Sequence, residues 1–259
     1  MKPTQHIHSY FETLYRAWGR QHWWPAQSPF EVIVGAYLTQ NTSWSNVERA
    51  LDKLRAARIL SVSGIRRTPL PKLERLIRSA GYFRQKAQRL KTFVRFLDRH
   101  YDGSLARMFA QPTSKLREEL LTLNGIGPET ADSILLYAGN HPVFVVDAYT
   151  RRILERHQLI APHASYDEIR ELFEQALRPL AEGSPGVFES KFDPLAAEAA
   201  GLRGSSHPPS RMSTGSRSAA VQVFNEMHGL MVGVGKNYCK KSQPECEQCP
   251  LKKFLPEAK

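Results

Sequence analysis

The sequence lacks any uninterrupted apolar run of eighteen residues, and its first fifteen residues contain no apolar core of the kind found in secretory signal peptides. We therefore expect neither a membrane-spanning helix nor a leader, and we expect a cytoplasmic protein. Cysteine is also scarce, because the chain of 259 residues has three, all near the C-terminus. An odd, clustered set of cysteines in a reducing compartment indicates metal ligands before disulfides.

Acidic side chains are in the minority. The chain has 36 lysine and arginine residues against 25 aspartate and glutamate residues, which gives a net charge of +11. This surplus suits a polyanionic partner, although basic surfaces also occur on proteins that bind none. Nucleic acid is the favoured interpretation, and the length leaves room for one large or two modest domains.

The most informative stretch is residues 114–152. Leucines at helical spacing come first, and Asn124-Gly125-Ile126-Gly127 then breaks the pattern. Two glycines flanking one apolar residue give a tight turn whose backbone can lie close to another molecule. A second predicted helix follows, with Pro128 in its first turn. The free N–H groups of such a turn and helix start suit a phosphate and ignore base sequence.

This turn is followed by Thr130-Ala131 and later by Val145-Val146-Asp147. In order and interval these motifs resemble the helix-hairpin-helix (HhH-GPD) DNA glycosylases of the endonuclease III superfamily. The resemblance implies an all-α, two-lobed glycosylase fold and a base-excision repair enzyme. In that family the hairpin binds DNA phosphates, and the corresponding residues here are Asn124, Gly125, Ile126, Gly127 and Thr130.

The domain organisation follows from the same resemblance. We expect a six-helix bundle with the hairpin over residues 28–138, and a second helical lobe built from residues 1–27 and 139–259. The end of segment 183–218 has no acidic and few apolar side chains, so burial cannot offset its ordering entropy. We expect a flexible insert over 183–218 and a cysteine loop over 239–255.

Asp147 precedes a predicted helix, where most aspartates serve simply as N-caps. In the family that the chain resembles, this aspartate is catalytic, because a carboxylate opposes the positive charge that develops on the sugar as the base leaves. Bifunctional relatives have a lysine two positions after the second hairpin glycine, and its amine forms a Schiff base. This chain has Glu129 there, so the resemblance implies a monofunctional glycosylase that leaves an abasic site.

Adjacent tryptophans in a loop either pack in a core or line a pocket, and by themselves they favour packing. This Trp-Trp-Pro run resembles the same point in the type III 3-methyladenine DNA glycosylases, where aromatic rings enclose the excised base. A cationic alkylated purine such as 3-methyladenine is a good leaving group and stacks well on such rings. The implied base pocket comprises Trp23, Trp24, Pro25, Trp44, Glu129 and Lys236.

Several polar residues have two interpretations. Gln40 and Asn41 either form an ordinary helix connection or, as the resemblance implies, fill the gap left by an extruded nucleotide, which is the favoured interpretation. Lys236 and the charges of the predicted helix that begins near residue 81, Lys86 among them, are more simply surface groups. His228, alone on a predicted helix, is interpreted as a packed or hydrogen-bonded histidine rather than a ligand.

Cys239, Cys246 and Cys249 have the spacing C-x6-C-x2-C, similar to the iron–sulfur loop of the family, C-x6-C-x2-C-x5-C. The fourth expected cysteine falls on Leu255. A [4Fe–4S] cluster with another fourth ligand, a different metal, and a decayed site held by packing all stay open. Base hydrolysis itself requires no metal.

The predicted partner is double-stranded DNA with a damaged base, bound by a monomer without membrane association. Two alternatives compete with the alkylpurine glycosylase. One is an endonuclease III-type glycosylase and lyase for oxidised pyrimidines, which Glu129 disfavours. The other is a lesion-binding protein without chemistry.

Overall fold

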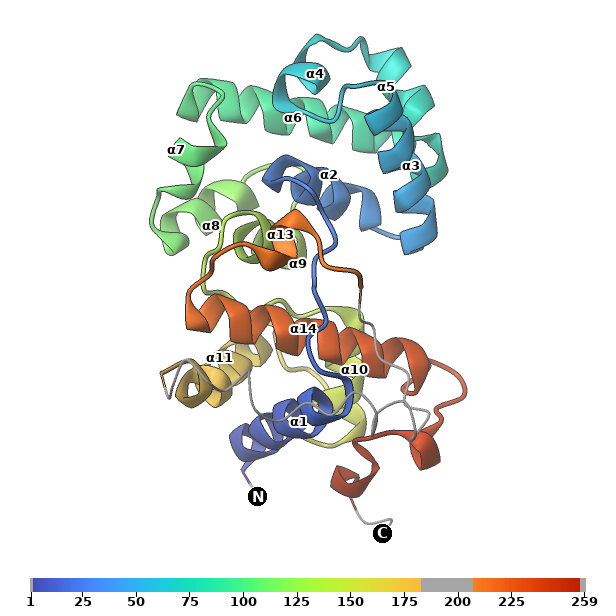
Figure 1. Ribbon diagram of the computed structural model, residues 1–259, viewed down its shortest axis with the longest axis vertical. Coiled ribbons are helices and arrows are strands. Elements are labelled where there is room, and N and C mark those ends of the chain that lie inside the picture. Colours follow the sequence, from blue (N-terminus) through green and yellow to red (C-terminus); the bar gives the residue numbers. More distant parts are fainter. Residues whose placement is uncertain (1, 183–206, 257–259) are drawn as a thin grey trace. The chain divides into compact units, whose positions relative to one another are not determined.

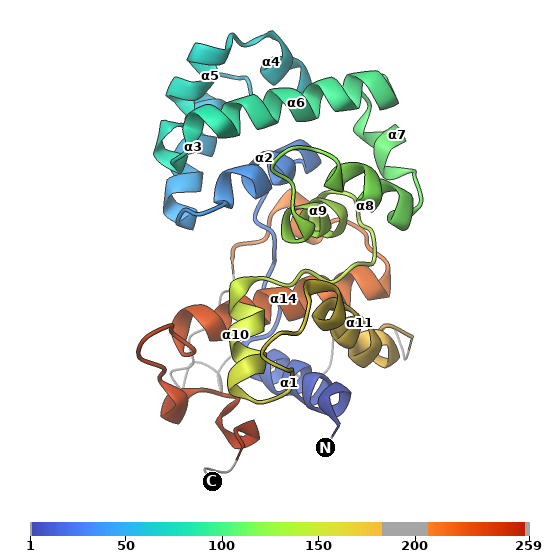
Figure 2. The ribbon, with the colours of Figure 1, turned by 180° about the vertical axis from the view of Figure 1, so that it is seen from behind.

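The computed structural model describes residues 2–182 and 207–256, and every regular element within these ranges is a helix (Figures 1 and 2). The all-α prediction is confirmed. The chain divides into two compact units, Ala26–His141 and the combination of Met1–Pro25 with Pro142–Lys259. In the described ranges, no helix combines the length and the apolar character that crossing a membrane requires.

The unit Ala26–His141 is organised around α2 (Pro29–Thr39), in which every side chain from Phe30 to Leu38 is buried. A helix that is covered on all sides must lie at the centre of its unit, and α2 packs against α3, α6, α9 and η2. The other helices of this unit are α3 (Trp44–Ala56), α4 (Val62–Arg67), α5 (Leu70–Leu76), η1 (Arg78–Ala80), α6 (Phe83–Tyr101), α7 (Leu105–Phe109), α8 (Thr113–Leu121), α9 (Pro128–Ser133) and η2 (Ile134–Ala138).

This unit, all of it described, contains eight α-helices where six were expected, because short capped helices occupy some connections. Helix α4 is an example, since the Ser61 side chain accepts a hydrogen bond from the Gly64 N–H and starts a turn that the sequence pattern did not indicate. The second hairpin helix also changes form, because α9 continues directly into the π-helical turn η2.

The second unit is organised around α14 (Ala219–Asn237), whose residues from Val221 to Gly235 are all buried. Three helices, α1, α10 and α11, pack against it (Figures 1 and 2). The further helices here are α1 (Pro3–Trp18), α10 (Ala148–Arg156), α11 (Tyr166–Glu182), α13 (Arg211–Thr214), η3 (Cys246–Gln248) and η4 (Lys252–Phe254). Both units thus place one buried helix in the middle and amphipathic helices around it.

Of the expected insert, residues 183–206 lie outside the described residues. Residues 207–218 are described and are mostly exposed, with Ser210 and Ser213 buried and several hydrogen bonds along the segment. The N–H of His207 donates to the carbonyl of Gln21, and the buried Ser210 caps α13 by accepting from the N–H of Ser213. Hydroxyl caps and backbone hydrogen bonds order this segment where apolar side chains are few.

Candidate functional site

The hairpin lies between α8 and α9, and its two glycines differ. Gly125 has a φ of +84°, and a Cβ there would lie 2.0 Å from Nε of Arg89. Gly127 has a φ of −98° with open space where a Cβ would be. Ile126 is buried and anchors the turn, while Asn124 and Gly127 are exposed. The turn therefore presents its backbone at the surface, in the form that phosphate binding requires.

Gln40 braces this hairpin. Its Nε2 donates to the carbonyl of Gly125 at 2.8 Å and to Oγ1 of Thr130 at 3.0 Å, and its Oε1 accepts from Arg89 at 2.9 Å. The side chain expected to fill a gap in DNA is thus engaged within the protein. Its neighbour Asn41 is exposed, with a left-handed φ of 54°. Of the two amides, Asn41 is the one presented to solvent.

Lys86 binds the backbone around the end of α2, and its assignment to a solvated helix face is wrong. The side chain is buried, and its Nζ donates to the carbonyls of Leu38, Gln40 and Ala80 at 2.9, 2.7 and 2.7 Å. Burial, together with the charge of Arg89, lowers the pKa of Lys86 to about 8. The ammonium therefore satisfies carbonyls at the C-terminal end of α2 that have no partner within the helix.

Tyr82 was not singled out from the sequence. Among the described residues it is the one large hydrophobic side chain that is exposed, with 65% of its surface accessible. It takes a left-handed φ of 43° as the residue before α6, four positions ahead of Lys86. An exposed aromatic ring offers a face on which a base can stack.

Asp147 is the N-cap of α10 in the other unit. Its Oδ1 accepts from the N–H of Thr150 at 2.7 Å, so the ordinary capping interpretation of this aspartate is correct as geometry. The side chain is not sealed in the interior, since 13% of it is exposed. Oδ2 plays no part in that cap and lies 3.7 Å from Nε2 of His228. The carboxylate thus has one oxygen fixed by the helix and the other turned toward an imidazole.

His228 links this carboxylate to the tryptophan loop. It is buried on α14, where its ring makes edge contacts with Trp23 at 6.0 Å and with Phe144 at 6.3 Å between centroids. Burial lowers the pKa of His228, and the charge of Asp147 opposes that shift. Gly229 lets the loop approach, because a Cβ there would lie 3.2 Å from that of Trp23. Nothing in the sequence predicts this association, since the three segments are far apart along the chain.

The other predicted pocket residues differ in exposure. Trp23 and Pro25 are half-buried, whereas Trp24 is 6% exposed and meets the Trp23 ring edge to face at 5.8 Å, as in core packing. Lys236 is exposed at the end of α14. Trp44 is half-buried and Glu129 is exposed, and both belong to the unit Ala26–His141.

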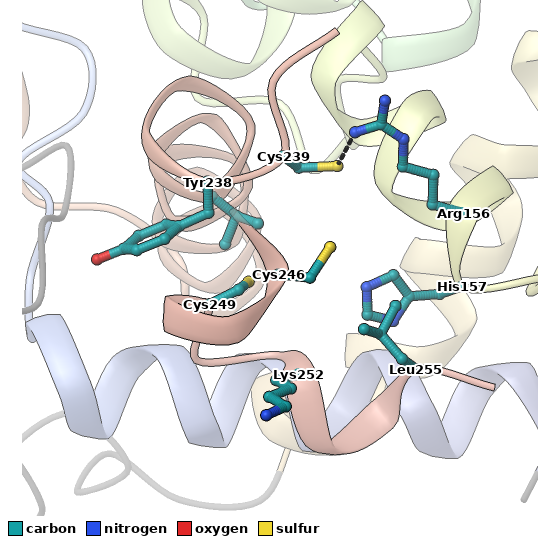
Figure 3. Close-up of a pocket in the computed structure, with 9 residues that line it drawn as sticks. Arg156, His157, Tyr238, Cys239, Cys246, Cys249, Lys252 and Leu255 are labelled. Carbon is teal, nitrogen blue, oxygen red and sulfur yellow. Dashed lines mark hydrogen bonds between the residues drawn. The ribbon is translucent and has the colours of Figure 1, made fainter. Parts of the chain in front are cut away.

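The three cysteines line one cavity together with His157 and Leu255 (Figure 3). The cavity measures about 20 Å³, which is room for roughly one water molecule. Burial raises the pKa of Cys249 to about 11, and the neighbouring thiols add to the shift. This environment favours the neutral thiol, whereas the thiolate is the form that binds metal.

The donor set does not fit a four-thiolate cluster. Leu255 lines the cavity where the family pattern has its fourth cysteine, and Nδ1 of His157 is 2.6 Å from the hydroxyl of Tyr10. Within the ranges that the structure describes, no three His, Cys, Asp or Glu side chains are arranged to hold a metal ion. Contacts within the protein hold this loop in place.

Two arginines of α10 hold the loop. Arg152 donates from Nε to the carbonyl of Cys239 at 2.7 Å. Arg156 donates to the Cys239 sulfur at 3.2 Å and to the carbonyls of Lys240 and Lys241 at 2.7 and 2.9 Å. The loop is thus fixed to the helix that Asp147 caps, by guanidinium groups that bind otherwise unpaired carbonyls.

Comparisons with known proteins agree with this architecture. The family described as HhH-GPD superfamily base excision DNA repair protein matches residues 34–179. A candidate DNA repair glycosylase of Methanocaldococcus jannaschii is 38% identical over 96% of this chain and 94% of its own length. Endonuclease III of Thermotoga maritima is 28% identical over 86% of this chain and 81% of its own length.

Two solved structures are similar in fold over most of this chain. The H. pylori 3-methyladenine DNA glycosylase bound to 1,N6-ethenoadenine has a TM-score of 0.70 and 26% identity, and the match covers 91% of this chain and 98% of that one. An endonuclease III–DNA complex has a TM-score of 0.69 and 20% identity, with 99% and 97% of the two chains covered. The second likeness concerns the fold alone.

Proposed function

The chain belongs to the HhH-GPD superfamily of base excision DNA repair proteins, and from that premise we propose that it is a monofunctional DNA N-glycosylase for an alkylated purine such as 3-methyladenine. One observation carries the proposal. Asp147 is held at the start of α10 by one carboxylate oxygen, and its side chain stays partly accessible. A fixed carboxylate of this kind can oppose positive charge on a sugar without first reorganising.

The reaction follows from that charge. When the N-glycosidic bond breaks, its electron pair leaves with the base and the deoxyribose becomes cationic. The ionised Asp147 stabilises this cation, the oxygen of a water molecule bonds to the anomeric carbon, and the water's proton passes to solvent. A purine that is already cationic through alkylation departs as a neutral base. The site therefore needs no strong general acid, and Asp147 is the proposed catalytic residue.

Glu129 supports a reaction without strand cleavage. It stands in the first turn of α9, two residues after Gly127, and its side chain is exposed. A carboxylate cannot attack the sugar and form an imine, whereas a lysine amine can. We infer that the product is an abasic site on an intact strand.

Four further features support DNA as the substrate. The uncapped start of α9 offers backbone N–H groups to a phosphate. Asn41 is an exposed amide beside the hairpin brace, so we assign the filling of the vacated base position to Asn41 rather than to Gln40. The half-buried Trp23 supplies a ring for a cationic base, and the net charge of +11 favours a polyanion.

Base release from defined duplexes tests the proposal. Duplexes carrying 3-methyladenine, 1,N6-ethenoadenine, an oxidised pyrimidine or no lesion are incubated with the full chain, and the free base is measured with and without borohydride. We expect release of the alkylated purine and no covalent protein–DNA adduct. A trapped adduct on the oxidised pyrimidine indicates an endonuclease III-type lyase instead. Tight binding of a lesion without any release indicates a protein that binds damage and performs no chemistry.

A further inference from the structure

His228 lies where it can control the carboxylate of Asp147. Its Nε2 is 3.7 Å from Oδ2, while the other oxygen of the carboxylate is held by the N–H of Thr150 at 2.7 Å. The two side chains are 6% and 13% exposed. A pair so shielded from water interacts more strongly than it would at the surface. The imidazole therefore has both the position and the surroundings to influence where the second oxygen points.

The ring of His228 is itself held in place. The edges of Trp23 and Phe144 meet it at 63° and 74°, and Asn225, on the preceding turn of α14, is fully buried. Packing of this kind leaves a side chain few rotamers, because interiors are dense. Trp23, a member of the proposed base pocket, and Phe144 thus help to set the direction of Nε2.

An ionised carboxylate accepts hydrogen bonds and cannot donate them. The ring nitrogen that faces it is therefore assigned as the N–H, with the imidazole neutral. At 3.7 Å the contact is longer than a hydrogen bond, and closing it to about 3.0 Å requires a shift of about 0.7 Å. Catalytic hydrogen bonds are often this long without substrate and shorten in the complex.

We propose that His228 is a positioning residue for base release, which donates its Nε2–H to Oδ2 of Asp147 and so aims the carboxylate at the sugar. The inference rests on the proposed function, because it assigns a partner to the carboxylate used there. The buried ring, which meets Trp23 and Phe144 by its edges, brings a polar nitrogen beside this carboxylate.

Three substitutions separate a donor from a space filler. His228→Leu removes the N–H, His228→Gln places an amide N–H near the position of Nε2, and His228→Asn has the same chemistry on a shorter side chain. Single-turnover base release from an alkylated duplex is measured for each full-length variant, alongside the dissociation constant for the same duplex and the melting temperature. A structural role alone predicts that all three variants lose stability together and that base release follows it.

We expect His228→Leu to lower the single-turnover rate about 100-fold, the loss typical of a misplaced catalytic group. The duplex dissociation constant should change by less than about twofold, since neither His228 nor Asp147 lies on the proposed phosphate-binding hairpin. His228→Gln should recover most of the rate, and His228→Asn should not. If His228→Leu fails to fold, the comparison of Gln with Asn decides.

Each other result overturns the inference. Equal rates for His228→Leu and the wild type exclude a positioning role, and equal rates for His228→Gln and His228→Asn exclude a donor at the place of Nε2. A wild-type protein that releases no base from any duplex overturns the proposed function and this inference with it. Base release by the wild type together with an unaffected His228→Leu variant overturns the inference alone.

Discussion

The hairpin and the carboxylate site use the start of a helix in opposite ways. Helix α9 begins at Gly127 and Pro128 without a side-chain cap, which is the form of helix start proposed here to meet an external phosphate. Helix α10 begins at Asp147, whose carboxylate occupies the N–H of Thr150. Under the proposed function, the start of α9 receives an anion of the substrate. The start of α10 holds an anion of the protein in place, and that carboxylate is the proposed reactive group.

The largest effect is expected where the charge is removed and the cap is kept. Asparagine is as good an N-cap as aspartate, so Asp147→Asn should leave α10 and the melting temperature nearly unchanged. Base release should fall by about 1,000-fold or more, because the sugar cation loses its counter-charge. DNA affinity, measured by fluorescence anisotropy, should be retained. Base release near the wild-type rate would separate Asp147 from the chemistry and leave it as a cap alone.

A matched pair of glycine substitutions tests the open helix start. Gly125→Ala forces a side chain into a φ of +84° and against Arg89, which must move and release Gln40. The unfolding free energy, measured with urea, should fall by about 1–3 kcal/mol. Gly127→Ala is the control, because its φ is ordinary and its Cβ meets open space. Its effect should stay within about 0.5 kcal/mol. Equally small effects at the two positions would show that the turn tolerates any small residue.

The two regions also differ in how much of each the sequence predicts. The hairpin is consecutive, and a glycine pair with a following proline indicates its turn and its open helix start directly. The sequence predicts Asp147 as a cap, which the structure confirms, and through the resemblance as a reactive group, which stays a prediction. His228, which lies beside Asp147, and Trp23, which contacts His228, come from remote segments that only tertiary packing brings together. Local patterns do not encode such contacts.

Charge patterns were misleading for a related reason. Lys86 lies among several basic residues on α6, a pattern that predicts a solvated face. In the structure its side chain is buried, and its ammonium binds three backbone carbonyls. The sequence pattern likewise favours an exposed amide at Gln40, whereas its side chain forms hydrogen bonds with Gly125, Thr130 and Arg89. A polar side chain is buried where unpaired backbone groups need it, and those groups are visible only in the folded chain.

A smaller effect distinguishes the two adjacent amides. Gln40→Ala removes three hydrogen bonds that hold the hairpin, so the unfolding free energy should fall by about 1–2 kcal/mol. Asn41→Ala should lower the unfolding free energy by less, about 0.5–1 kcal/mol, since this side chain is exposed and the main cost is an alanine at a left-handed φ of 54°. Base release should still decline in Asn41→Ala if that amide fills the vacated base position. A larger loss of stability for Asn41→Ala than for Gln40→Ala would reverse the two roles.

The smallest expected effect is a pH dependence of the unfolding free energy, and it arises from Lys86 in the unit Ala26–His141. The pKa of Lys86 is about 8 in the folded protein and 10.5 in the unfolded chain. Between these values the unfolded state binds more protons, so the contribution of Lys86 to the unfolding free energy rises with pH. Below about pH 8 both states are protonated, and the cost of burying the charge is fully present. Lys86→Met removes this titration and keeps an apolar stem of similar length.

The free energy of unfolding should therefore increase for the wild type relative to Lys86→Met as the pH rises from 8 to 10. Urea unfolding of both proteins at matched pH values measures this difference, and subtraction cancels every other group that titrates alike in the two proteins. This trend belongs to the unit Ala26–His141, because the carbonyls that Lys86 binds lie in that unit and not in the unit that contains Asp147. A difference that stays constant with pH would mean that the ammonium is well solvated. In that case the hydrogen bonds from Lys86 to the carbonyls of Leu38, Gln40 and Ala80 would not shield its charge from water.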